Sequence, residues 1–146
     1  MTIKIVTVVL AIIRNNEGKY LMTLRVANDP EDRGYLGFWQ IPGGGWQIGE
    51  TMEQAVLREA REELGINVEI IQKIPKVFDS MRNDWRGQLN CYLCKMKNPD
   101  EKIVLNEEAS EYKWFTFDEI KKLKSFPANN SIIQEAEKIS SADERS

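Results

Sequence analysis

The chain has 146 residues, of which 42% are hydrophobic and 29% charged, with a formal net charge of −3 and no histidine. These values predict one globular domain over residues 1–146 with its own hydrophobic core. The acidic balance argues against a broad nucleic-acid interface, which needs a basic face. The missing histidine excludes histidine-based acid–base catalysis, Ser-His-Asp triads and His-ligated zinc.

The first third of the chain predicts three strands joined by loops. Residues 3–14 are β-branched and aliphatic, which favours a buried strand, and the turn sequence at 15–18 predicts that residues 19–26 return beside it as a hairpin. The polar residues 27–37 are expected to form a loop. The short stretch 38–42 predicts a strand that leads into three consecutive glycines, which we expect to form a loop whose backbone closely approaches a ligand or ion.

The next stretch predicts a helix from Met52 to Leu64 with both ends specified. Thr51 and Gln54 have the spacing of a capping box, which satisfies free backbone N–H groups at a helix start. Gly65 stands where a helix end favours a left-handed residue.

The remainder of the chain predicts three further strands, a weak fourth, and two helices. The expected strands lie at 67–78, 88–96, 103–105 (the weak one) and 112–117, with a loop or hairpin connection at 80–87, a helix from its cap Asp118 to Leu123, and a final helix after Pro127. No repeat or linker divides this order. It predicts an α/β fold with a mixed sheet and helices on both faces.

Two further stretches concern the cellular compartment. Cys91 and Cys94 form a Cys-x-x-Cys, but on a strand such residues point to opposite faces, so we expect structural cysteines in a reducing cytoplasm rather than a redox pair or chelate. The apolar stretch 5–13 is too short to span a bilayer and has no cleavage site after it. A cytoplasmic protein with no membrane partner is therefore expected.

Three glutamates of the predicted helix carry the strongest chemical signal. Glu59, Glu62 and Glu63 fall within about one third of the helix circumference, where like charges repel. Arg58 precedes Glu62 by four residues and partly offsets this charge, but one arginine does not balance three carboxylates. Such a cluster alone is usually a solvated helix face. A bound cation is the alternative, and oxygen ligands without histidine or thiolate favour Mg²⁺ or Mn²⁺.

The wider spacing decides between these readings. Gly44, then Glu50, then the run from Arg58 to Ile66 (Arg-Glu-Ala-Arg-Glu-Glu-Leu-Gly-Ile) resembles the Nudix box in full register. Only Ala60 departs from the pattern, where a bulky aliphatic residue is usual. The resemblance implies a Nudix-type α/β/α sandwich with a mixed β-sheet, and hydrolysis of a nucleoside diphosphate linked to a variable group X.

The resemblance also implies roles for particular residues. It assigns Glu59 and Glu63 as principal metal ligands, Glu62 as a supporting ligand, the Gly44 carbonyl as a further ligand, Arg58 as the residue that orients the glutamates, and Glu50 as an accessory carboxylate. Two or more ions are expected, because one would not offset both the carboxylates and a polyanionic substrate.

In several Nudix enzymes a further glutamate near the C-terminal strand acts as base or metal ligand. Glu107, Glu108 and Glu111 are the candidates here, and the spacing does not choose among them. A solvated loop before a strand would explain the same residues equally well.

Three residues are candidates for substrate binding. Gly43 belongs to the glycine run, and Arg25 ends the second strand where related enzymes carry a phosphate- or nucleotide-binding arginine, although a surface charge is an equal alternative. The sequence Phe126-Pro-Ala-Asn129 is similar to one that enters the last helix of MutT-type enzymes, whose asparagine reads the base. Asn129 would then contact a base edge, or it would serve as a helix cap.

The predicted function is Mg²⁺-dependent cleavage of a nucleoside or deoxynucleoside triphosphate to monophosphate and pyrophosphate. The stretch 32–39 also resembles a pyrimidine-preferring branch of the family, which agrees on a triphosphate and disagrees on the base. The alternatives are ADP-ribose, a dinucleotide polyphosphate or an RNA 5′ end as substrate, or a sensing domain that binds a nucleotide without hydrolysis. The expected partner is a small-molecule nucleotide rather than a nucleic acid, with the chain a monomer or homodimer.

Overall fold

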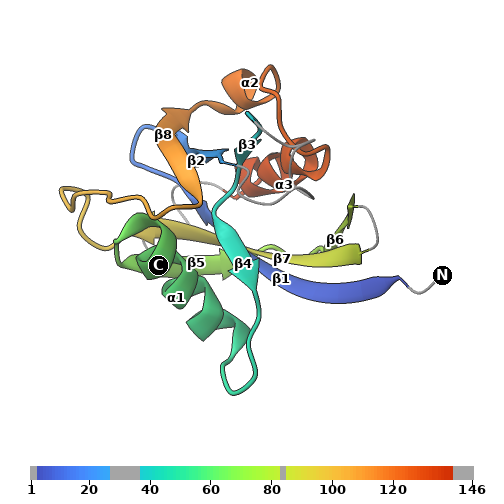
Figure 1. The fold of residues 1–146 in the computed structure, drawn as a ribbon. Coiled ribbons are helices and arrows are strands. Elements are labelled where there is room, and N and C mark those ends of the chain that lie inside the picture. The colour runs from blue at the N-terminus through green and yellow to red at the C-terminus, as the bar shows by residue number, and fades with distance from the viewer. Residues whose placement is uncertain (1–2, 27–36, 83–84, 140–146) are drawn as a thin grey trace.

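The computed structural model describes residues 3–26, 37–82 and 85–139, which form two sheets and three helices (Figure 1). The strands are β1 (Lys4–Ile13), β2 (Tyr20–Arg25), β3 (Trp39–Gln40), β4 (Gly43–Gly45), β5 (Val68–Lys73), β6 (Phe78–Arg82), β7 (Trp85–Met96) and β8 (Ala109–Phe115), and the helices are α1 (Met52–Leu64), α2 (Phe117–Ile120) and α3 (Ala128–Glu137). The expected loop at 27–37 lies outside the described residues, except for Gly37.

The larger sheet has the order β4-β1-β7-β5, and β6 also pairs with β7. Strands β1 and β7 are parallel over ten residue pairs, whereas the other pairs are antiparallel, so the sheet is mixed. The smaller sheet has the order β3-β2-β8. Helix α1 covers one face of the larger sheet, and the smaller sheet with α2 and α3 lies on the other side (Figure 1). The predicted α/β sandwich is confirmed.

Alternation along β1 explains why both faces are covered. Val9, Ala11 and Ile13 pack in the core beneath α1, while Ile12 packs in the core that includes α3. A strand with apolar residues on both faces needs cover on both sides. Alternation along β7 has the same effect on the two cysteines. Cys91 packs in the core that includes α3, and Cys94 packs in the core beneath α1, so they lie on opposite faces as predicted.

The predicted hairpin between the first two strands is wrong. Strand β2 pairs with β3 and β8 in the smaller sheet, and only an isolated bridge between Arg14 and Tyr20 links it to the end of β1. The reason is that β1 already pairs with β7 along one edge and with β4 along the other, so at Val8–Leu10 neither edge is available to β2. The turn at residues 15–18 therefore carries the chain from one sheet into the next.

Three local predictions also need correction. The glycine run forms the short strand β4 rather than a loop. Residues 103–105 form no strand, because the Val104 N–H donates to the carbonyl of Leu64 at the end of α1. The cap of α2 is Thr116, whose hydroxyl accepts from the Glu119 N–H, so Asp118 lies inside the helix.

Other predictions agree with the structure. Helix α1 has the predicted bounds, with the Thr51–Gln54 capping box and with Gly65 in the left-handed region at φ 66°. The predicted strand at 88–96 is part of β7, which begins at Trp85 and forms a hairpin with β6. Within the described ranges, no helix has both the length and the apolar character needed to span a bilayer.

Candidate active site

At Gly43 and Gly44, strand β4 is packed so closely that a side chain would not fit. A Cβ atom on Gly43 would lie 2.2 Å from the carbonyl oxygen of Val9 on β1. A Cβ atom on Gly44 would lie 2.6 Å from Oε1 of Glu59 on α1. The glycines therefore let the backbone of β4 lie between β1 and the carboxylates of α1.

The three glutamates of α1 differ in burial. Glu59 and Glu63 are each only 8% exposed, because residues four apart face the same side of the helix, here the side of β4. The Glu62 side chain is 56% exposed. The Gly43 N–H donates to Oε2 of Glu63 at 3.2 Å, which fixes this carboxylate against the glycine strand.

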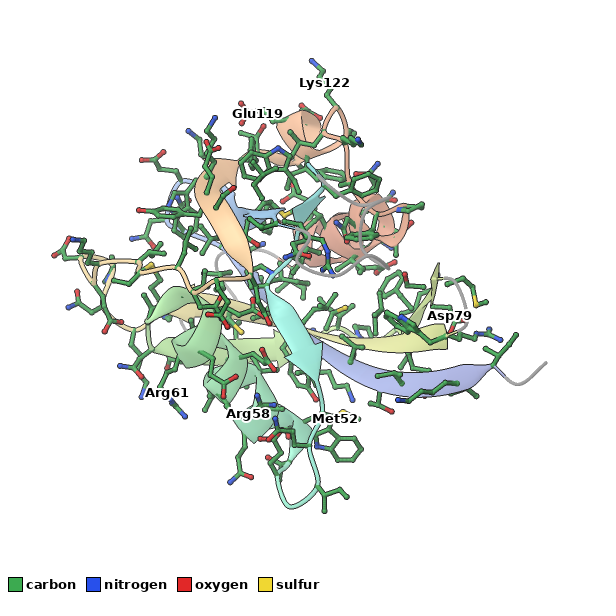
Figure 2. The ribbon with its side chains drawn as sticks, in the orientation of Figure 1. Met52, Arg58, Arg61, Asp79, Glu119 and Lys122 are labelled. Atoms are coloured by element: carbon green, nitrogen blue, oxygen red, sulfur yellow. The ribbon has the colours of Figure 1, made fainter. Side chains whose placement is uncertain are left out.

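Arg58 holds the acidic side chains in place (Figure 2). Its guanidinium donates two hydrogen bonds to Glu50, at 2.8 and 3.0 Å, and one to Glu59 at 2.9 Å. It also donates to Glu62 at 3.2 Å and to the carbonyl of Gly45 at 3.0 Å. The paired geometry with Glu50 holds the pKa of that carboxyl below its usual range.

A fourth carboxylate reaches this group from the loop before β8. Burial raises the pKa of Glu63 well above its usual range, and the charges of Glu59 and Glu108 raise it further. Burial and the charge of Glu59 also raise the pKa of Glu108. The structure thus brings Glu108 to the α1 carboxylates, whereas Glu111 lies on β8 in an ion pair with Lys113 at 3.2 Å. Glu107 does not line the pocket described next, whereas Glu108 does.

We call the hollow between these groups the acidic pocket, with a volume of about 280 Å³. It is lined by Gly43, Gly44, Gly45, Trp46, Gln47, Arg58, Glu59, Glu62, Glu63, Asn106 and Glu108. Its donors are carboxylate and backbone oxygens, the type that suits Mg²⁺ or Mn²⁺. Across the described ranges no three acidic or thiol side chains already converge as a metal cage. Arg58 and the Gly43 N–H hold the glutamates instead.

A second hollow, which we call the central cleft, lies against the same glycine strand and has a volume of about 290 Å³. Its lining comprises Val6, Val8, Leu10, Arg25, Gln40, Ile41, Gly43, Gly44, Gly45, Ser80, Trp85, Leu89, Phe126 and Asn129. Gly43, Gly44 and Gly45 line both hollows, so β4 is their shared wall.

The candidates Arg25 and Asn129 from the sequence both line the central cleft. Arg25 donates to Oε1 of Gln40 at 3.1 Å. Asn129 is 4% exposed, and its amide donates to the carbonyl of Trp39 at 3.4 Å. The alternative that Asn129 caps the last helix is wrong, because the N-cap of α3 is Pro127 and no side chain caps it.

Sequence reasoning missed several lining residues. Gln40 pairs with Thr23 across β3 and β2, and the antiparallel register that brings it beside Arg25 cannot be read from the chain. Ser80 and Trp85 fall in the stretch interpreted as a loop or hairpin connection. A tryptophan within that polar stretch was the available signal.

Comparisons with known proteins agree with this geometry. A family model described as "NUDIX domain" matches residues 4–136. The nucleoside triphosphatase NudI of Enterobacter sp. (strain 638) is 38% identical over 124 residues, which cover 75% of this chain and 81% of that protein. The RNA pyrophosphohydrolase of Orientia tsutsugamushi (strain Boryong) is 36% identical over 98 residues, which cover 57% and 61% respectively.

Solved structures show the same fold. The solution structure of the E. coli ORF135 protein matches with a TM-score of 0.74 at 24% identity, over 96% of this chain and 94% of that one. The crystal structure of a C. elegans Ap4A hydrolase binary complex matches with a TM-score of 0.74 at 20% identity, over 91% and 96%. With the family match across residues 4–136 and the acidic pocket in place, the chain belongs to the NUDIX domain family and is a Nudix hydrolase.

Proposed function

We propose that the chain hydrolyses a nucleoside or deoxynucleoside triphosphate to the monophosphate and pyrophosphate, with Mg²⁺ or Mn²⁺ in the acidic pocket. The observation that carries this proposal is that β4 forms a wall of two hollows, the central cleft and the acidic pocket with the carboxylates of α1. A nucleotide lying across β4 would place its base near Asn129 and its phosphates over the acidic pocket. The similarity to a nucleoside triphosphatase supports the same substrate class.

The oxygen donors of the acidic pocket fit a divalent metal. The proposed ligands are Glu59, Glu63 and the Gly44 carbonyl, with Glu62 in support and Glu108 as a further ligand or base. Bound ions would polarise the phosphoanhydride and acidify a water molecule. Two or more ions are proposed, since the pocket and a polyphosphate are both strongly negative.

The other residues would position these groups. Arg58, fixed by Glu50, holds Glu59 against β4 through the hydrogen bonds described above. Asn129 offers an amide donor and acceptor to a base edge, and Arg25 offers a cation to the nucleotide.

A substrate screen in H₂¹⁸O with Mg²⁺ tests the reaction. The panel is ribo- and deoxyribonucleoside triphosphates, ADP-ribose, a dinucleotide polyphosphate and a 5′-triphosphorylated RNA. We expect pyrophosphate release from a triphosphate, and the labelled product identifies the attacked phosphorus. Preference for a sugar nucleotide or the RNA end over every triphosphate would overturn the proposed substrate. Tight binding without turnover would overturn the proposed chemistry.

Paired variants test the fourth carboxylate. We expect Glu108→Gln to lower kcat at least about tenfold, because this carboxylate faces Glu63. Glu111→Gln is expected to leave kcat within about twofold, since Glu111 is paired with Lys113 on β8. Equal losses in the two variants would contradict the choice of Glu108.

A further inference from the structure

A third hollow, which we call the distal cleft, continues from the central cleft. It has a volume of about 510 Å³ and is lined by Phe38, residues 79–81 of β6, and residues 125–128, which lead into α3. Ser80 and Phe126 line both clefts. The distal cleft and the acidic pocket share no described lining residue. The order along the molecule is therefore acidic pocket, central cleft, distal cleft.

The walls of the distal cleft are mainly apolar. The rings of Phe38 and Phe126 lie 5.1 Å apart at an angle of 56°. Met81 is 56% exposed, so an apolar side chain stands open to solvent. Ala128 contributes a small side chain at the start of α3. An apolar group entering here would remove these surfaces from water, which is favourable in proportion to the area buried.

The charges around the distal cleft argue against a second nucleotide as its occupant. Asp79 is the only charged side chain among the described lining residues, and it accepts from Arg86 at 3.0 Å (Figure 2 labels Asp79 on β6). A phosphodiester would meet this carboxylate and no lining cation. Lys124 lies over the Phe38 ring, with Nζ 5.1 Å from the centroid, but it does not line the cleft.

The position of the base follows from Phe126, which lines both clefts and lies beside Asn129. Phe126 precedes Asn129 by three residues, and its carbonyl accepts the Asn129 N–H at 3.0 Å. A base that contacts Asn129 therefore lies next to Phe126, with the phosphates directed toward β4 at the other end. The group directed into the distal cleft would be one attached to the base.

We propose that the distal cleft is a subsite for an apolar substituent on the base of the substrate. The preferred substrates are then nucleoside triphosphates whose base carries an apolar group of about the size of a phenyl ring. This inference rests on the proposed function. Burial of such a group is expected to raise kcat/KM at least about tenfold, mainly through a lower KM.

Matched substrate pairs test the inference with the whole chain and Mg²⁺. The pairs are ATP with N6-benzyl-ATP and UTP with 5-phenyl-UTP, and the readout is the ratio of kcat/KM within each pair. We expect a ratio of about ten or more in at least one pair. Ala128→Phe, which fills the cleft, and Met81→Ala, which removes an exposed apolar wall, should both bring that ratio toward one. Ser131→Leu adds an apolar side chain at an exposed position of α3 and should preserve the ratio.

The outcomes separate this inference from the function on which it rests. Hydrolysis of both members of each pair at equal kcat/KM, or a high ratio that neither Ala128→Phe nor Met81→Ala lowers, overturns the subsite while the proposed function stands. Preference for a 5′-triphosphorylated dinucleotide over all four compounds assigns the cleft to a second nucleotide and also overturns it. Absence of hydrolysis for every triphosphate refutes the proposed function, and the subsite with it.

Discussion

Replacing Glu63 with glutamine should change how the stability of the metal-free protein depends on pH. Glu63 is 8% exposed, and burial together with the charges of Glu59 and Glu108 raises its pKa well above the ordinary value of 4.5. The unfolded chain releases this proton near pH 4.5, whereas the folded protein retains it to higher pH. Folding is therefore linked to proton uptake at this position.

The sign and size of the effect follow from that linkage. As pH rises above 4.5, the unfolded state binds fewer protons than the folded state, so Glu63 lowers the free energy of unfolding by about 1.4 kcal/mol per pH unit. Glutamine does not titrate, so Glu63→Gln lacks this loss. Between pH 5.5 and 7.5 the free energy of unfolding of the variant should rise by up to about 3 kcal/mol relative to wild type.

Urea unfolding in EDTA at pH 5.5, 6.5 and 7.5 measures this difference. Glu69→Gln is the matched control, because Glu69 is an exposed carboxylate on β5 that forms a surface pair with Lys95. Added Mg²⁺ should stabilise wild type and not Glu63→Gln, since a ligand that binds only the folded state raises its stability. A difference between wild type and Glu63→Gln that stays constant across this pH range would refute the reasoning. Turnover by the variant at the wild-type rate would refute the proposed role of Glu63.

Two further predictions concern glycine and cysteine positions. Gly44→Ala should lower kcat about a hundredfold, with the fold retained by circular dichroism, because the new Cβ would displace the Glu59 carboxylate 2.6 Å away. A Cβ at Gly45 would meet no atom within 4 Å, so Gly45→Ala should lose much less activity, and equal losses would contradict this account. Cys91 and Cys94 are buried, and burial raises the pKa of both thiols to about 12, so a thiol reagent at pH 8 should modify them only in denaturant; rapid modification of the native protein would show that these thiols are accessible.

Features set by neighbouring residues could be predicted from the sequence. The bounds of α1 follow from the Thr51–Gln54 pair and from Gly65, because capping involves groups within one helical turn. The opposite placement of Cys91 and Cys94 follows from strand alternation. Helical spacing likewise placed the α1 glutamates on one face.

Features that depend on long-range pairing could not be predicted in this way. The turn at residues 15–18 has the composition of a hairpin turn, but β7 pairs along one edge of β1, β4 pairs with the other edge at Val8–Leu10, and β2 joins another sheet. The spacing of the sequence did not distinguish Glu107, Glu108 and Glu111 as candidates for the further base or metal ligand. The choice of Glu108 depends on the segment that crosses the end of α1, where the Asn106 N–H donates to the Glu63 carbonyl at 3.3 Å.

The sequence by itself therefore determined the acidic helix, its ends and the glycine run before it, because short-range spacing and capping specify them. Only the tertiary structure decided that Glu59 and Glu63 are buried while Glu62 is exposed, and that β4 separates the acidic pocket from the central cleft. The physical reason is that burial and shared walls arise from packing between segments far apart in the chain, which local patterns do not encode.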